Sequence, residues 1–138
     1  MNLKEEERQI VVSMELEKAE RTFAETTILL QNKLWSNLAN RLYYVLFHSV
    51  SALLIYDGYE VGTHKGAVIR FHQYYVKTGL FSPEEGAFYS QMQSLRERAD
   101  YNCFYDVSET EVTERIEPTR QFLMKIRNII NGKKIVVK

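Results

Sequence analysis

Apolar residues recur every three or four positions over most of the chain, which is the spacing of one face of an amphipathic helix. This pattern predicts helices over residues 3–30, 36–57, 63–78, 82–100 and 108–131. The expected buried stripes are Val12, Leu16, Ala19, Phe23, Thr27 and Leu30; Ala39, Leu42, Leu46, Val50, Leu53 and Leu54; Val68, Phe71 and Tyr75; and Val112, Ile116, Thr119, Leu123, Ile126 and Ile130. We therefore expect an all-α protein, an up-and-down helical bundle of four main helices plus a shorter one.

Capping sequences mark several of the expected helix starts. Ser82 is followed by proline at the first helical position and by Glu85, and Ser108 with Glu111 repeats this capping box. Thr63 is suited to cap the third helix. These signals fix where the helices begin more firmly than the apolar period does.

The last helix has two irregular features. Pro118 lies too far inside it to be an N-terminal proline, so we expect a kink near residues 114–117 or a start later than Ser108. Gly132 is expected to follow the helix end at Asn131. The sequence thus predicts a single domain over residues 1–132 and a short tail over 133–138, either disordered or adding a strand.

Composition and charge exclude several classes of protein. The 18 Lys and Arg residues balance 18 Asp and Glu residues, which argues against a general polyanion binder. The lone Cys103 rules out an internal disulfide framework and a thiolate metal cluster, and we expect no metal and no other cofactor. Residues 1–12 lack the pattern of a signal peptide, and no apolar run approaches the roughly 20 residues that span a bilayer. The expectation is a cytoplasmic protein without membrane association.

Charged and hydroxyl side chains are concentrated where the fourth helix is expected to end, in the segment SLRERADYNCFY over residues 94–105. Arg96 could bind a phosphate through forked hydrogen bonds, with Arg98 nearby. Alternatively, Arg96 and Asp100, four residues apart, form an ion pair that anchors Tyr101. Both interpretations remain open from the sequence.

The second helix carries polar residues beside its apolar stripe. Arg41, Tyr44 and His48 are spaced by three and four residues and so share a face. If His48 reaches Arg96 across the bundle or a dimer interface, acid–base chemistry becomes possible. The alternative is a buried polar network in which Arg41 pairs with Asp100.

A second candidate site lies at the start of the third helix. His64 and Lys65 stand there beside free backbone N–H groups, an arrangement that suits an anion. His64 could also supply the imidazole near Arg96. Capping by Thr63, with His64 and Lys65 exposed, explains the same residues without a ligand.

Separated motifs, in order over residues 36–105, resemble the HEPN superfamily and more closely its small stand-alone UPF0332-like branch. The matching residues are Asn40, Arg41, Leu42, Tyr43, Tyr44, Phe47 and His48; Ala52, Leu53, Leu54 and Gly58; Thr63, His64, Lys65 and Gly66; Phe71; Val76, Lys77, Thr78 and Gly79; and Leu95, Arg96, Ala99, Asp100 and Tyr101. The resemblance implies a helical bundle that often forms homodimers, with polar motif residues near the interface.

The resemblance also implies a choice of functions. Many HEPN proteins are metal-independent ribonucleases in which an arginine is followed a few residues later by histidine, and many are encoded beside a minimal nucleotidyltransferase as toxin–antitoxin pairs. Here Tyr101, Asn102 and Cys103 occupy the window after Arg96, so the histidine is absent. We therefore expect a binding or regulatory protein that partners a minimal nucleotidyltransferase, with RNA or a nucleotide as possible ligand. The alternatives are a ribonuclease toxin using Arg96 with a substituted acid or base such as His48, and a protein whose Tyr101 the partner adenylylates.

Overall fold

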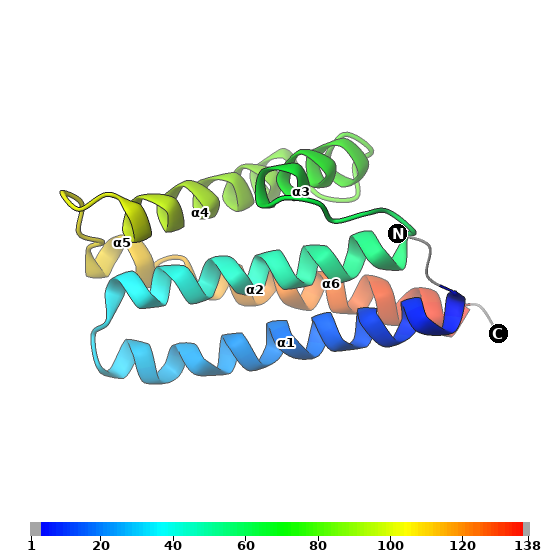
Figure 1. Ribbon diagram of the computed structural model, residues 1–138, viewed down its shortest axis with the longest axis horizontal. Coiled ribbons are helices and arrows are strands. Elements are labelled where there is room, and N and C mark those ends of the chain that lie inside the picture. Colours follow the sequence, from blue (N-terminus) through cyan, green and yellow to red (C-terminus); the bar gives the residue numbers. More distant parts are fainter. Residues whose placement is uncertain (1–3, 137–138) are drawn as a thin grey trace.

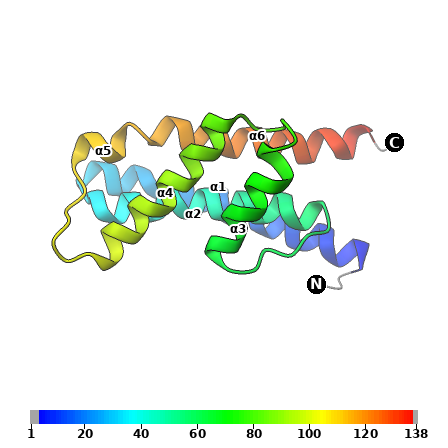
Figure 2. The ribbon, with the colours of Figure 1, turned by 90° about the horizontal axis from the view of Figure 1, so that it is seen from above.

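The computed structural model describes residues 4–136 and confirms the all-α prediction. Its elements are α1 (Glu5–Gln31), α2 (Trp35–Tyr56), α3 (His64–Phe71), the π-helical turn η1 (His72–Val76), α4 (Pro83–Tyr101), α5 (Glu109–Thr113) and α6 (Ile116–Val136). Figure 1 shows α1, α2 and α6 running lengthwise, with α3 and α4 forming a layer above α2. Seen from above, α4 crosses over α2 (Figure 2).

Helix α2 is the centre of the bundle and packs against α1, α4 and α6. Its predicted stripe is confirmed: Ala39, Leu42, Leu46, Val50, Leu53 and Leu54 are all buried. By length and composition α2 could cross a membrane, so the expectation that no apolar run approaches that length is wrong. However, 72% of its apolar window is buried inside the bundle, and a central core helix needs this composition.

The buried face of α1 differs from the predicted one in its second half. Thr22 and Thr26 are buried, whereas Thr27 and Leu30 are exposed. The buried residues of α1, from Val12 to Thr26, recur on average every 3.5 residues, because four steps cover 14 residues, and not every 3.6 as on a straight helix. The small difference in period accumulates along the 27 residues of α1 and rotates its face.

The predicted irregularity around Pro118 is confirmed. Helix α5 ends at Thr113 and α6 starts at Ile116, so Pro118 lies in the first turn of α6, where its missing N–H removes no intrahelical bond. The expected end at Asn131 is wrong, because α6 continues through Gly132 to Val136. Glycine inside a helix is tolerated at a modest cost, so Gly132 does not end α6. Residues 133–136 of the expected tail are helical and add no strand. The rest of the expected tail, residues 137–138, lies outside the described residues.

Candidate functional site

The side chain of Arg96 in α4 is enclosed by aromatic rings from two helices. Arg96 is only 6% exposed, although arginine is rarely buried. Its guanidinium carbon lies 4.8 Å from the ring centre of Tyr43, 5.6 Å from that of Tyr44 and 5.9 Å from that of Tyr101. A cation over the faces of desolvated rings is stabilised by about 1–2 kcal/mol. We call Arg96, Tyr43, Tyr44, Asp100 and Tyr101 the Arg96 cluster.

The predicted pairing within α4 is confirmed. Nη1 of Arg96 lies 3.6 Å from Oδ2 of Asp100 and donates a long hydrogen bond of 3.5 Å to the hydroxyl of Tyr101. Nε of Arg96 is buried and has no hydrogen-bond partner among the described residues. The chain's own groups therefore neutralise the cation and cover it, although they leave one of its donors unused.

The expected pairing of Arg41 with Asp100 is wrong. Asn40, one residue earlier in α2, donates from Nδ2 to Oδ2 of Asp100 at 3.0 Å. Arg41 instead donates to Oδ1 of Asn40 from Nε at 3.0 Å and from Nη2 at 2.7 Å, and it lies 3.8 Å from Glu25 of α1. Arg41 thus orients the Asn40 amide, whose other end holds Asp100. Its guanidinium carbon also lies 5.1 Å from the ring centre of Tyr44, so Arg41 contacts the Arg96 cluster directly.

The histidine that joins the Arg96 cluster is His64, at the start of α3. Its Nδ1 shares a 2.7 Å hydrogen bond with the hydroxyl of Tyr43, and its ring centre lies 4.3 Å from that of Phe47. Burial, with the charge of Arg96, lowers the pKa of His64. Burial also raises the pKa of Tyr43 to about 12, although Arg96 opposes this. Both rings are therefore neutral near pH 7.

The structure does not bring His48 to Arg96 within one copy of the chain. Nδ1 of His48 lies 2.8 Å from Oε1 of Glu15 in α1. No hydrogen bond or ion pair joins His48 to Arg96 within the described part of the chain. The ring of His48 does lie 6.0 Å from that of Tyr44, so the predicted shared face of Arg41, Tyr44 and His48 is confirmed, whereas a catalytic role for His48 stays a prediction.

The remaining candidate residues lie outside the Arg96 cluster. Thr63 caps α3 as predicted, because its hydroxyl accepts a 2.9 Å hydrogen bond from the backbone N–H of Gly66, and Lys65 is exposed. Arg98 lies 4.8 Å from the ring centre of Tyr105, on the loop that follows α4. Among residues 4–136, no group of three or more His, Cys, Asp or Glu side chains could hold a metal ion.

Comparison with known proteins connects this geometry to a family. A model of the HEPN domain matches residues 12–129, which include every helix that contributes to the Arg96 cluster. The chain belongs to the HEPN family. It is 31% identical over 128 residues to a UPF0332 protein of Thermotoga maritima, an alignment that covers 93% of this chain and 97% of that protein. A protein of Methanocaldococcus jannaschii that bears the name "putative toxin" is 30% identical over 115 residues, covering 83% of this chain and 85% of that protein.

Within this HEPN protein, the sequence did not single out two residues of the site. Tyr43 has the spacing of a core residue and is fully buried. In addition, its hydroxyl shares a hydrogen bond with His64, and its ring packs against the guanidinium of Arg96. Asn40 precedes Arg41, and only the crossing of α2 and α4 shows that it, and not Arg41, meets Asp100. The one available signal was the presence of Asn40 at the start of the HEPN-like motif of α2.

Proposed function

We propose that this HEPN protein is a cytoplasmic binding and regulatory partner of a minimal nucleotidyltransferase, in a toxin–antitoxin-like system that acts on nucleotides or RNA. The observation that carries the proposal is the burial of Arg96. A metal-independent ribonuclease needs a cation at the scissile phosphate and groups that transfer protons. Here the cation is 6% exposed and paired with Asp100, and the neutral imidazole of His64 is bonded to Tyr43.

The names of two similar proteins support a role in a toxin–antitoxin-like system. Two proteins of Methanocaldococcus jannaschii that resemble this chain carry the name "putative toxin", the second at 25% identity over 121 residues. A toxin-like HEPN protein whose arginine is covered is well suited to act through a second protein. The Arg96 cluster then serves as a rigid polar support between α2 and α4 and presents Tyr101 beside the following loop.

Two measurements test this proposal together. Coexpressed with the minimal nucleotidyltransferase from the adjacent reading frame, the protein is expected to copurify with it, and the purified HEPN protein alone is expected to leave RNA intact. Cleavage of RNA that is lost in a folded Arg96→Lys variant, but kept in the exposed Lys77→Ala variant, would show a ribonuclease instead. The lysine introduced by Arg96→Lys keeps the positive charge but lacks the forked N–H donors of arginine.

A second candidate function rests on the position of Tyr101. Although Tyr101 belongs to the Arg96 cluster, it is 77% exposed, and its hydroxyl accepts the bond from Arg96 at 3.5 Å. An exposed hydroxyl is an accessible acceptor for a nucleotidyl group, and the hydrogen bond from the fixed guanidinium of Arg96 holds this hydroxyl in one place. We propose that Tyr101 is the residue that the partner adenylylates, if the partner modifies this protein.

Intact mass spectrometry tests the modification of Tyr101. In this reaction the phenolic oxygen of Tyr101 loses its proton and attacks the α-phosphorus of ATP, and pyrophosphate leaves. After incubation with the nucleotidyltransferase and ATP, the wild-type protein is therefore expected to gain the mass of an adenylyl group, that is AMP less water, and Tyr101→Phe is expected to gain none. Tyr105→Phe is the matched comparison, because Tyr105 lies four residues further on, in the loop that follows α4, where it is less exposed and its hydroxyl donates to Glu111. Equal mass gain in wild type and Tyr101→Phe would assign the modification to another residue.

A further inference from the structure

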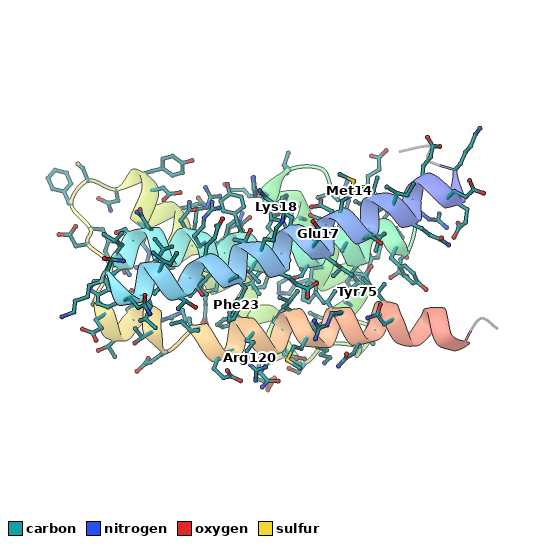
Figure 3. The ribbon with its side chains drawn as sticks, turned by 90° about the horizontal axis from the view of Figure 1, so that it is seen from below. Met14, Glu17, Lys18, Phe23, Tyr75 and Arg120 are labelled. Carbon is teal, nitrogen blue, oxygen red and sulfur yellow. The ribbon has the colours of Figure 1, made fainter. Side chains whose placement is uncertain are left out.

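The loop between α4 and α5 carries the most exposed large apolar side chain among the residues that the structure describes. Phe104 is 97% exposed, and Tyr101, where α4 ends, is 77% exposed. Figure 1 shows this loop projecting from one end of the molecule, and in Figure 3 its side chains stand clear of the bundle. Single exposed apolar residues are ordinary, but a ring left almost wholly in water forgoes all the stabilisation that burial gives. Phe104 therefore contributes nothing to the core and requires another explanation.

Phe104 and Tyr101 line one open hollow. The hollow has a volume of about 430 Å³ and lies between the last turn of α4 and the start of the loop, with Glu97 and Arg98 also in its wall. Glu97 precedes Tyr101 by four residues, so the carboxylate and the ring lie on the same side of α4. We call Glu97, Tyr101 and Phe104, with the space between them, the aromatic hollow.

The loop holds Phe104 in this position through its own contacts. The side-chain oxygen of Asn102 accepts a 2.9 Å hydrogen bond from the backbone N–H of Phe104, and the backbone carbonyl of Asn102 accepts one of 3.1 Å from Tyr105. The ring centre of Tyr105 lies 4.8 Å from the guanidinium carbon of Arg98, and its hydroxyl donates to Glu111 in α5. A surface that is ordered in advance loses little conformational freedom on binding. The aromatic hollow is therefore preorganised for a partner.

The charges of the aromatic hollow favour a cation. The carboxylate of Glu97 forms no ion pair or hydrogen bond with a side chain that the structure describes. Arg98 also lines the hollow, but its guanidinium lies over the ring of Tyr105. The faces of aromatic rings and a carboxylate both attract a cationic side chain, whereas the carboxylate repels the phosphates of RNA. A protein with a basic side chain therefore fits the hollow better than a nucleic acid does.

We propose that the aromatic hollow binds an arginine side chain of the minimal nucleotidyltransferase. The planar guanidinium stacks on the exposed rings of Phe104 and Tyr101 and pairs with the carboxylate of Glu97 through its forked donors, which lysine lacks. This inference rests on the proposed function, because it takes the same partner. It adds the surface and the chemistry by which that partner is recognised. Phe104 has no hydroxyl and lies outside the Arg96 cluster, so its substitution leaves that cluster unchanged.

Biolayer interferometry with the purified nucleotidyltransferase from the adjacent reading frame tests the role of the ring. Phe104→Ser is expected to weaken binding about tenfold or more, because a few central aromatic residues dominate an interface. Phe104→Tyr, which keeps a ring, is expected to retain most of the affinity. Leu80→Ser is the matched control, because Leu80 is an exposed apolar residue in the loop before α4, and it is expected to bind like wild type. Circular dichroism checks that these substitutions leave the helices intact.

Substitution of Glu97 tests the cation. Glu97→Gln is expected to weaken binding about threefold, and Glu97→Lys is expected to weaken it further, because lysine repels the arginine. Raising the salt concentration is expected to weaken the wild type more than Glu97→Gln, since salt screens an exposed ion pair. Asp106→Asn is the matched control, because Asp106 is an exposed carboxylate of the same loop that does not line the hollow.

The outcomes separate this inference from the proposed function. If the wild type binds the nucleotidyltransferase and both Phe104→Ser and Glu97→Lys bind it equally well, the partner docks elsewhere and only this inference fails. If the wild type does not bind it, the proposed function fails and the inference with it. Tighter binding by Glu97→Lys would show that the partner presents an anion, which also overturns the inference.

Two other occupants of the hollow are distinguished by the same variants. Phe104→Ser that binds the nucleotidyltransferase normally, but has lost affinity for a fluorescein-labelled single-stranded RNA, would assign the hollow to base stacking. Phe104→Ser that binds the nucleotidyltransferase normally, but separates two copies of this chain in sedimentation analysis, would assign it to a contact between copies. Either result would replace the arginine of the nucleotidyltransferase as the occupant.

Discussion

Replacing Arg96 with alanine is expected to lower the free energy of unfolding by roughly 3 kcal/mol. The substitution removes a buried cation from between the rings of Tyr43, Tyr44 and Tyr101, and it leaves Asp100 without its positive partner. It also leaves a void where the arginine stem packed, since Arg96 is 6% exposed. The loss arises at the contact of α2 and α4, so it affects global stability and not only the end of one helix.

Urea-induced unfolding followed by circular dichroism measures this effect. Arg96→Lys is expected to lose less stability, because lysine retains the charge and part of the stem but not the planar donors. Arg98→Ala is the matched variant: it removes the same side chain two residues away, where the arginine is exposed and contacts one ring, that of Tyr105. Equal stability of Arg96→Ala and Arg98→Ala would contradict the structural role that we assign to the Arg96 cluster.

The helices could be predicted from the sequence because their signals are local. Ser82 and Ser108 each cap a helix through the box with Glu85 or Glu111. The predicted apolar stripe of α2 agrees with the buried residues because α2 is central. Neighbouring helices surround α2, so a small rotation about its axis would not expose the stripe. On α1 the same reasoning failed at Thr27 and Leu30, since the residues that α1 buries depend on how it packs against α2 and α6 and not on α1 alone.

The site could be predicted only in part, for a related reason. The pairing of Arg96 with Asp100 is fixed by spacing within one helix, so the sequence shows it. Which residues of α2 meet them depends on the angle at which α4 crosses, and a shift of one position selects Asn40 in place of Arg41. Likewise, spacing alone could not show that α1 binds the ring of His48 through Glu15.

The position of α4 also depends on a glycine whose importance the sequence did not reveal. Gly86 is buried in the first turns of α4, where it faces η1. A Cβ at this position would lie 2.8 Å from Cγ2 of Val76 and 2.9 Å from Nε2 of His72, closer than atoms pack. His72 cannot easily move away, because its Nδ1 bonds to the carbonyl of Val68 at 2.9 Å. The two segments therefore approach as closely as they do because residue 86 lacks a side chain.

Gly86→Val is accordingly expected to lower the free energy of unfolding by about 3 kcal/mol, measured by urea unfolding. Ala87→Val, at the exposed neighbouring position, is expected to lower it by less than about 1 kcal/mol through helix propensity alone. Gly132→Ala has the opposite expected sign, a gain of about 0.5–1 kcal/mol, because its Cβ would meet no atom within 4 Å and alanine favours the helix. Combining Gly86→Val with Val76→Ala should recover part of the loss, since the closest contact is then removed. If Gly86→Val and Ala87→Val were equally stable, α4 would be free to move away from η1, and the close approach could not be what holds α4, and Arg96 with it, in place.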